Sequence, residues 1–289
     1  MQFKFQSENK PAGFSPLVRR SAPIFSIILA VFLLSMCDTD ERLEFDDIPV
    51  VESYLSVNKP VSIQISRKTP YDDNVKLSSD IIENLEIKIS YDGLTRIIPP
   101  VNDSVFCDSA FYPKEGVTYS LEFTFNQRTV SSSTQIPGKP VNFSQSVTQI
   151  SLPTFKFGQG RPSGGPNMPN PVKLTWDNGD ESYYMVVTEN METNPTEVFE
   201  TNDTLDAPRR IFRNEPTQAS QTEIAGMSFQ YFGRHRLILF HLNADYAALY
   251  TNTGNTSQNL TNPITNITNG LGIFTGINSD TLYLNVLKE

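Results

Sequence analysis

The side chain with the clearest chemistry in this chain is the thiol of Cys37. An arginine pair at positions 19–20 precedes an apolar run over residues 24–34, and the cysteine follows shortly after that run. A basic segment, a short apolar core and a cleavage position in this order are typical of a secretory signal peptide. The run is shorter than the about 20 residues that a membrane-spanning helix needs. Because a cysteine at the cleavage position can be lipidated, we predict a lipoprotein signal peptide over residues 1–36 and lipid attachment at Cys37.

The alternative is a plain signal peptide that is cleaved near Ser35 and leaves Cys37 as an ordinary thiol. A single acyl chain holds a protein to a membrane only marginally, whereas two or three chains attach it in effect permanently. The segment 37–47 is short and acidic, and it predicts a solvated tether between the anchor and the first folded domain.

The two histidines, His235 and His241, do not form a convincing metal site. On a strand their even separation puts them on one face, but about 20 Å apart at about 3.3 Å per residue. Neither lies in a recognisable hydrolase motif. The glycine-rich stretch from Gly158 to Gly165 lacks the Gly-Lys-Ser/Thr ending of a phosphate-binding loop. We therefore predict no catalytic residue, no metal and no cofactor.

Four short motifs are candidates for covalent modification. An aspartate followed by Ser or Thr and then an apolar residue matches the O-glycosylation pattern of exported Bacteroidota proteins. The candidate acceptors are Ser104, Ser109, Thr204 and Thr281.

The charge balance excludes some partners. The whole chain has 23 basic and 32 acidic residues, and residues 1–36 hold four of the basic ones and one acidic one. The mature chain thus keeps 19 basic and 31 acidic residues, a net charge of −12. This argues against nucleic acid, which is bound by neutralising phosphates, and against adhesion of the protein surface to an anionic membrane. With Cys37 lipidated, Cys107 has no disulfide partner, and its apolar neighbours favour a packing role.

The elements that position these residues are mostly strands. Residues 61–66 and 85–91 alternate between apolar and polar side chains with period two, the pattern of half-buried strands. Asp92-Gly93 is a hairpin turn signal. Residues 118–125 and 128–136 form a further predicted strand pair. We predict an immunoglobulin-like β-sandwich over residues 48–138.

A segment with two prolines and a glycine at 137–140 marks the predicted domain boundary. After it, a strand ending in Trp176, a polar turn and a tyrosine-bearing strand at 182–188 resemble the central strands of fibronectin type III modules. We predict a second β-sandwich of that kind over residues 139–289, with one short helix near 243–250. The fold class is therefore mainly β, with two sandwich domains.

Two loops of the second domain are predicted to contact a partner, because loops on a rigid sandwich commonly carry binding. The first runs from Gly158 to Pro171 and is longer than most connections in compact domains. The second covers residues 262–276. The residues predicted to bind the partner are Gly158, Arg161, Asn269 and Phe274.

Nearly the whole mature chain resembles a family of Bacteroidota outer-membrane lipoproteins known only as domain of unknown function 4249. The matching stretches are the lipobox-like residues 34–37, the runs 50–55 and 65–73, and residues 267–274 after a helix. This chain has Ser53 where the family often has glycine. The resemblance implies an outer-membrane lipoprotein, frequently encoded near TonB-dependent receptors, and it carries over no catalytic residues. Acidic residues after the lipid cysteine resemble a signal for the cell-surface leaflet, with a periplasm-facing anchor as the alternative.

We therefore expect a non-enzymatic, cell-surface lipoprotein that serves as an accessory or binding subunit of a TonB-dependent transporter. The partners would be outer-membrane lipid, through Cys37, and a receptor barrel, with no role for nucleic acid. The alternatives are a structural or adhesive surface lipoprotein and a glycan-binding or glycan-hydrolysing protein. An exposed apolar surface would favour a protein partner, whereas a concave aromatic cleft with paired carboxylates would favour a glycan.

Overall fold

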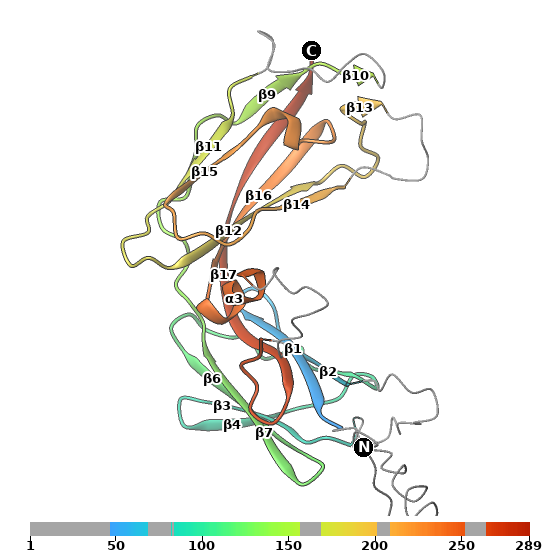
Figure 1. The fold of residues 1–289 in the computed structure, drawn as a ribbon, viewed down its shortest axis with the longest axis vertical. Helices are drawn as coiled ribbons and strands as arrows, with labels where there is room; N and C mark the ends of the chain where they lie inside the picture. Colours follow the sequence, from blue (N-terminus) through green and yellow to red (C-terminus); the bar gives the residue numbers. More distant parts are fainter. Residues whose placement is uncertain (1–46, 69–81, 83, 157–168, 201–208, 252–263) are drawn as a thin grey trace, which may run out of the picture. The chain divides into compact units, whose positions relative to one another are not determined.

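The computed structural model describes residues 47–68, 82, 84–156, 169–200, 209–251 and 264–289, whose regular structure is mainly β (Figure 1). The predicted mainly-β fold class is confirmed. In chain order the elements are β1 (Pro49–Ser56), β2 (Val61–Arg67), β3 (Ile87–Tyr91), β4 (Leu94–Ile98), β5 (Val105–Asp108), β6 (Thr118–Phe125), β7 (Arg128–Gln135), β8 (Ser144–Gln145), β9 (Gln149–Leu152), β10 (Phe155–Lys156), β11 (Val172–Thr175), β12 (Tyr183–Asn190), β13 (Phe199–Glu200), β14 (Ile211–Arg213), β15 (Gln221–Ile224), the 3-10 turn η1 (Gly226–Ser228), β16 (Gly233–Leu242), α3 (Ala244–Thr251) and β17 (Leu271–Lys288).

The first sandwich packs a four-stranded sheet, in the order β4-β3-β6-β7, against the β17-β1-β2-β5 part of a larger sheet. Its strands follow the predicted period of two. In β2 the side chains of Val61, Ile63 and Ile65 are fully buried, and the polar residues between them are exposed. Every second side chain therefore enters one apolar core.

The predicted turn at Asp92-Gly93 joins β3 and β4 as a hairpin. Both residues have positive φ angles, 46° and 74°, as a type I′ turn requires. Asn126 and Gln127, with φ angles of 46° and 62°, join β6 to β7 in the same way. Local turn chemistry thus sets the register of both strand pairs.

The second sandwich packs the sheet β15-β11-β8 against the β14-β12-β16-β17 part of the larger sheet. Its core includes Trp176, whose ring centroid lies 5.6 Å from that of Tyr184 on β12. The tryptophan and tyrosine that suggested a fibronectin-like module therefore do pack against each other.

One long strand serves both sandwiches. Residues 271–277 of β17 pair in parallel with β1, and residues 277–286 pair antiparallel with β16 (Figure 1). The larger sheet consequently runs without a break from β14 to β5. No helix among the described residues is long and apolar enough to cross a bilayer.

The last part of the chain also contributes to the first core. Ile267 and Phe274 are buried in the same cluster as residues of β1, β2 and β6. The predicted boundaries of the two domains, 48–138 and 139–289, stay a prediction, and the structure adds that residues near 267–274 pack with the first of them. The predicted short helix is α3, at Ala244–Thr251.

Candidate interaction surface

Asp47, the last residue of the predicted tether, is held on the first sandwich. The Arg67 guanidinium forms an ion pair with the Asp47 carboxylate, with one Nε–Oδ1 distance of 2.9 Å. Asn126 donates a second hydrogen bond of 2.9 Å to Asp47 Oδ2. The hydrogen bonds from Arg67 hold the pKa of the Asp47 carboxyl below its usual range, and Asn126 adds to the effect. The chain is thus fixed at the point where it enters β1.

Several predicted site residues lie outside the described residues. These are Cys37, Gly158, Arg161 and Thr204.

The second predicted partner-binding loop is a loop only in part, because residues 264–270 precede strand β17 and residues 271–276 belong to it. Asn269 is exposed, at a φ angle of 57°, and its Nδ2 donates to the carbonyl oxygen of Thr129 at 2.8 Å. Phe274 is different, since it belongs to strand β17 and its side chain is 0% exposed in the first core. The prediction that Phe274 contacts a partner is therefore wrong. The glycines on both sides of Phe274 favour a loop, whereas Phe274 pairs with Ser53 of β1.

The candidate glycosylation sites differ in accessibility. Ser109 is exposed just after β5, and Ser104 is half-buried just before it. Thr281 is half-buried in the middle of β17, opposite Ile238 of β16. Ser109 is the most accessible of the three.

His235 is almost fully buried, with 3% of its surface exposed. Its Nδ1 lies 3.1 Å from the carbonyl oxygen of Gly233, and its Nε2 lies 3.3 Å from Nδ2 of Asn190. Because the carbonyl can only accept and the amide nitrogen can only donate, these partners assign the neutral ring with its proton on Nδ1. Burial lowers the pKa of the His235 imidazole. The ring is therefore a neutral core group.

His241 also has a structural environment. Its Nδ1 lies 2.7 Å from the carbonyl oxygen of Gly138, and its ring stacks on Tyr184 with centroids 4.7 Å apart. Within the described part of the chain, no group of three His, Cys, Asp or Glu residues could hold a metal ion.

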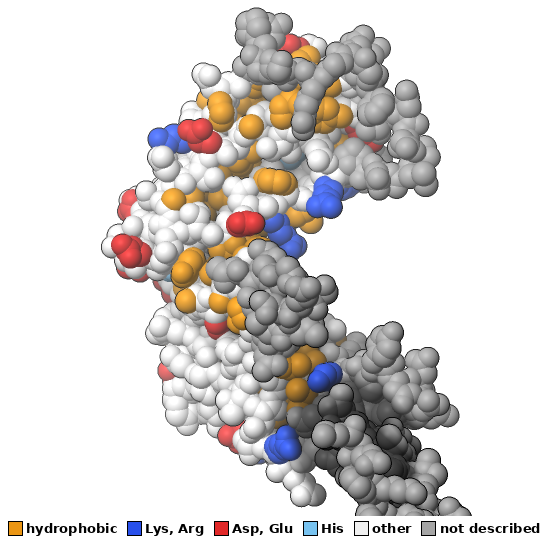
Figure 2. Space-filling view, in the orientation of Figure 1, with side chains coloured by type: hydrophobic (Ala, Val, Ile, Leu, Met, Phe, Trp, Pro, Cys, Tyr) orange, Lys and Arg blue, Asp and Glu red, His pale blue; other side chains and the backbone are white. Residues whose placement is uncertain are grey.

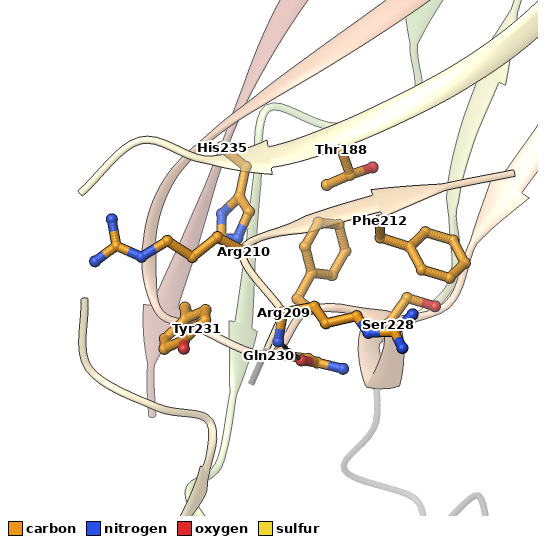
Figure 3. A pocket seen from close by; sticks show the side chains of 9 residues that line it. Thr188, Arg209, Arg210, Phe212, Ser228, Gln230, Tyr231 and His235 are labelled. Carbon is orange, nitrogen blue, oxygen red and sulfur yellow. Dashed lines mark hydrogen bonds between the residues drawn. The ribbon is translucent and has the colours of Figure 1, made fainter. Parts of the chain in front are cut away.

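A narrow hollow lies between His235 and strand β14, with room for about one water molecule (Figure 3). The hydroxyl oxygen of Thr188 is buried there without a hydrogen-bond partner among the described residues. The hollow is lined by Thr188, Arg209, Arg210, Phe212, Ser228, Phe229, Gln230, Tyr231 and His235.

Beside this hollow, strand β14 forms an exposed edge of the larger sheet. It pairs with β12 on one side, and no described strand pairs with its other side. Ile211 and Phe212 are 43% and 45% exposed. Together with Arg209 and Arg213 they line an open hollow. We call residues 209–213 the β14 surface. Figure 2 shows hydrophobic and basic side chains exposed next to each other on the viewed face.

The arginines of the β14 surface are not equivalent. The Arg210 guanidinium donates hydrogen bonds of 3.0 Å to the carbonyl oxygens of Glu192 and Thr193. The backbone N–H of Arg209 donates to Oε1 of Gln230 at 2.5 Å. Among the described residues, neither the Arg209 nor the Arg213 guanidinium forms a hydrogen bond or ion pair of this kind. Arg210 therefore fixes the backbone, while the other two cations face the open hollow.

A tyrosine cluster adjoins Arg213. The ring of Tyr54 on β1 lies 5.7 Å from that of Tyr246 on α3, and Tyr250 follows at 5.9 Å from Tyr246. Burial raises the pKa of Tyr54 to about 12, Glu52 adds to this rise, and Arg213 opposes it. Burial also raises the pKa of Tyr246, again with Arg213 in opposition. Arg213 is thus close enough to both phenols to influence their ionisation.

Residues 37–282 match the family described as domain of unknown function (DUF4249). The chain belongs to this family. No curated protein matches the chain. Among solved structures, the chain is similar to one described as the central fibronectin-III array of RIM-binding protein, at 10% identity and a TM-score of 0.21, over 85% of this chain and 71% of that one.

The family description assigns no site, so the candidate surface rests on the geometry of this chain. Sequence reasoning missed β14 because a three-residue strand has no visible period. A usable signal was present, however. Residues 209–213 read Arg-Arg-Ile-Phe-Arg, a basic and apolar segment in a strongly acidic chain.

Proposed function

We propose that the mature chain is a lipid-anchored, non-catalytic outer-membrane lipoprotein that binds a protein partner at the β14 surface. The anchor is supported by the signal-like segment before Cys37 and by the family match, which begins at that same residue. Arg67 and Asn126 both form hydrogen bonds with Asp47, which suits a chain that passes from a tether into a folded domain at this residue.

The observation that best supports a protein partner is the exposure of Ile211 and Phe212 on an open sheet edge. Apolar side chains gathered on a surface mark sites of protein contact. Native proteins otherwise cover such edges or block them. Both histidines are held by structural hydrogen bonds, which supports a binding role over catalysis.

The partner we propose is a TonB-dependent transporter barrel, because the resemblance to outer-membrane lipoproteins implies that genomic setting. The chain would then be an accessory subunit of that transporter. The acidic residues that follow Cys37 favour the cell-surface leaflet.

The anchor is tested by growing cells with radiolabelled palmitate and comparing wild type with Cys37→Ala. The label should enter the wild-type protein and be absent from the variant, which should also leave the membrane fraction. Protease added to intact cells should degrade a surface-facing protein and spare a periplasm-facing one. Equal labelling of the two proteins would refute the anchor.

The partner is tested by mild detergent extraction of the tagged native lipoprotein and mass spectrometry of what copurifies. A near-stoichiometric transporter barrel is the expected result. Arg213→Glu should reduce the yield of the barrel, and Lys88→Glu, an exposed change on the first sandwich, should not. Recovery of the lipoprotein alone, with crosslinking also negative, would refute the transporter role and favour the adhesive alternative.

A further inference from the structure

We propose that the open edge of β14 binds an extended, acidic segment of the partner as an added β-strand. This inference rests on the proposed function, because it assumes a protein partner and specifies how that partner is recognised. Strand addition to a sheet edge is a general mode of peptide recognition, in which main-chain hydrogen bonds provide affinity and alternate side chains provide specificity.

The backbone of β14 is oriented for such an addition. The carbonyl oxygen of Arg210 accepts from the N–H of Asn190 on β12 at 2.9 Å, and the N–H of Asn214 donates to the carbonyl oxygen of Val186 at 3.0 Å. In an antiparallel pair, successive residues direct their backbone groups to opposite sides. The N–H and C=O groups of Ile211 therefore point away from β12, as do those of Arg213.

The side chains specify the chemistry of the added strand. Ile211 and Arg213 lie on one face of the sheet, since they are two positions apart, and Phe212 lies on the other. Phe212 can contact apolar side chains of a neighbouring strand on its own face. The cations of Arg209 and Arg213 suit carboxylates there. The added segment should thus alternate acidic and apolar residues.

A second copy of this chain is a poorer occupant of the same edge. If two β14 strands paired antiparallel about Ile211, Arg209 of one copy would lie opposite Arg213 of the other. Like charges directly opposite each other are destabilising in a sheet. The net charge of −12 on the mature chain adds a further repulsion between copies. A separate acidic strand avoids the contact between arginines, because its carboxylates lie opposite Arg209 and Arg213.

The test uses purified full-length lipoprotein in detergent and a fluorescein-labelled peptide of alternating valine and glutamate. Binding is measured by fluorescence anisotropy. One control peptide replaces every glutamate by lysine, and another has all its backbone nitrogens methylated, so that it can donate no main-chain hydrogen bond. Only the unmodified acidic peptide should bind, and the binding should weaken as salt is added.

The matched variants are Ile211→Pro and Ile211→Val. Proline removes the outward N–H and leaves the ladder to β12 intact, because that N–H takes no part in it. We expect Ile211→Pro to weaken peptide binding by about tenfold or more, and Ile211→Val to change it by less than about twofold. Arg213→Glu should also weaken binding. Thermal unfolding of each variant shows whether it is folded.

Three results would each overturn strand addition. The first is binding of the methylated peptide, and the second is equal peptide binding by wild type and folded Ile211→Pro. The third is that wild type does not bind the acidic peptide. Copurification of the transporter barrel tests the proposed function independently of strand addition at β14. If Ile211→Pro still recovers the barrel, the transporter role holds and strand addition is refuted. If wild type binds the peptide in the expected way and recovers no barrel, strand addition holds and the transporter role fails.

Discussion

Val51 and Gly272 lie opposite each other in the parallel pair of β1 and β17, so close that the glycine has no room for a side chain. A Cβ atom on Gly272 would overlap the carbonyl oxygen of Val51. The φ angle of Gly272 is also positive, at 95°, a conformation that only glycine adopts readily. This close approach joins the long strand β17 to the first sandwich.

We expect Gly272→Ala to destabilise the protein by on the order of 3 kcal/mol or more, because it adds backbone overlap to an unfavourable φ angle. Urea unfolding of the full-length protein in detergent measures the loss. Gly179→Ala is the control, since Gly179 is exposed and a Cβ there would meet no atom within 4 Å. A loss at Gly272 no larger than that at Gly179 would contradict the tight pairing of β1 and β17.

His235 should make stability depend on pH on the acid side of neutrality. Burial lowers the pKa of its imidazole, so the unfolded chain binds a proton at this residue more readily than the folded chain does. The contribution of His235 to the free energy of unfolding is then complete above the unfolded pKa of about 6.5. It falls as the pH drops below that value, by up to about 1.4 kcal/mol per pH unit. Urea unfolding between about pH 7 and pH 5 should show this slope, and His235→Gln should flatten it. An unchanged slope in that variant would assign it to other groups.

The ion pair between Asp47 and Arg67 should stabilise the entry to β1. Because the pKa of Asp47 is lowered in the folded state, its contribution is present above its ordinary value of about 4 and is lost as the pH falls through the folded pKa. We expect Asp47→Asn to cost about 1 kcal/mol at pH 7 and less at about pH 3. Glu86→Gln, in the exposed pair with Lys88, should have no measurable effect. If both variants lost the same free energy of unfolding, the idea that Asp47 stabilises the entry to β1 would be contradicted.

Tyr54 should remain protonated far into the alkaline range. Burial raises its pKa to about 12, so stability is unaffected by this group below about pH 10 and declines as the pH rises through about 12. The tyrosinate absorbance of wild type minus that of Tyr54→Phe isolates its titration. A difference curve with its midpoint near pH 10 would show that Tyr54 is not packed against α3 as described.

Ser109 is the described acceptor that a glycosyltransferase could reach most easily, because it is exposed in a turn. We expect the intact mass of the native protein to exceed that of the same protein treated to remove O-linked glycans, and Ser109→Ala to remove part of the excess. A native mass that this treatment does not change would remove the glycosylation hypothesis for all four candidate sites.

Much of the fold could be predicted from local pattern. The alternation in residues 61–66 identified β2, and Asp92-Gly93 identified the β3–β4 turn. The strands on either side of the turn at 177–180 were also visible in the sequence, whereas the contact between Trp176 and Tyr184 was not. These features depend on neighbours in sequence, whose spacing fixes which side chains share a face.

The interaction surface could not be predicted in this way. Strand β14 exists because residues 211–213 find a partner in residues 187–189 of β12, and a segment this short has no period of its own. Its exposure depends on its position at the end of a sheet order that is set by pairings far apart in the chain.

The sequence alone determined the strand-rich character and the acidic composition, because local spacing and residue counts carry them, and the lipid site at Cys37 stays a prediction from it. Tertiary structure alone decided that residues 271–288 form one strand shared by both sandwiches. It also placed Phe274 in the first core instead of a loop. The physical reason is that strand pairing is non-local. The partner of a strand is chosen by backbone hydrogen bonds and apolar burial between segments more than two hundred residues apart, such as Val51 and Gly272.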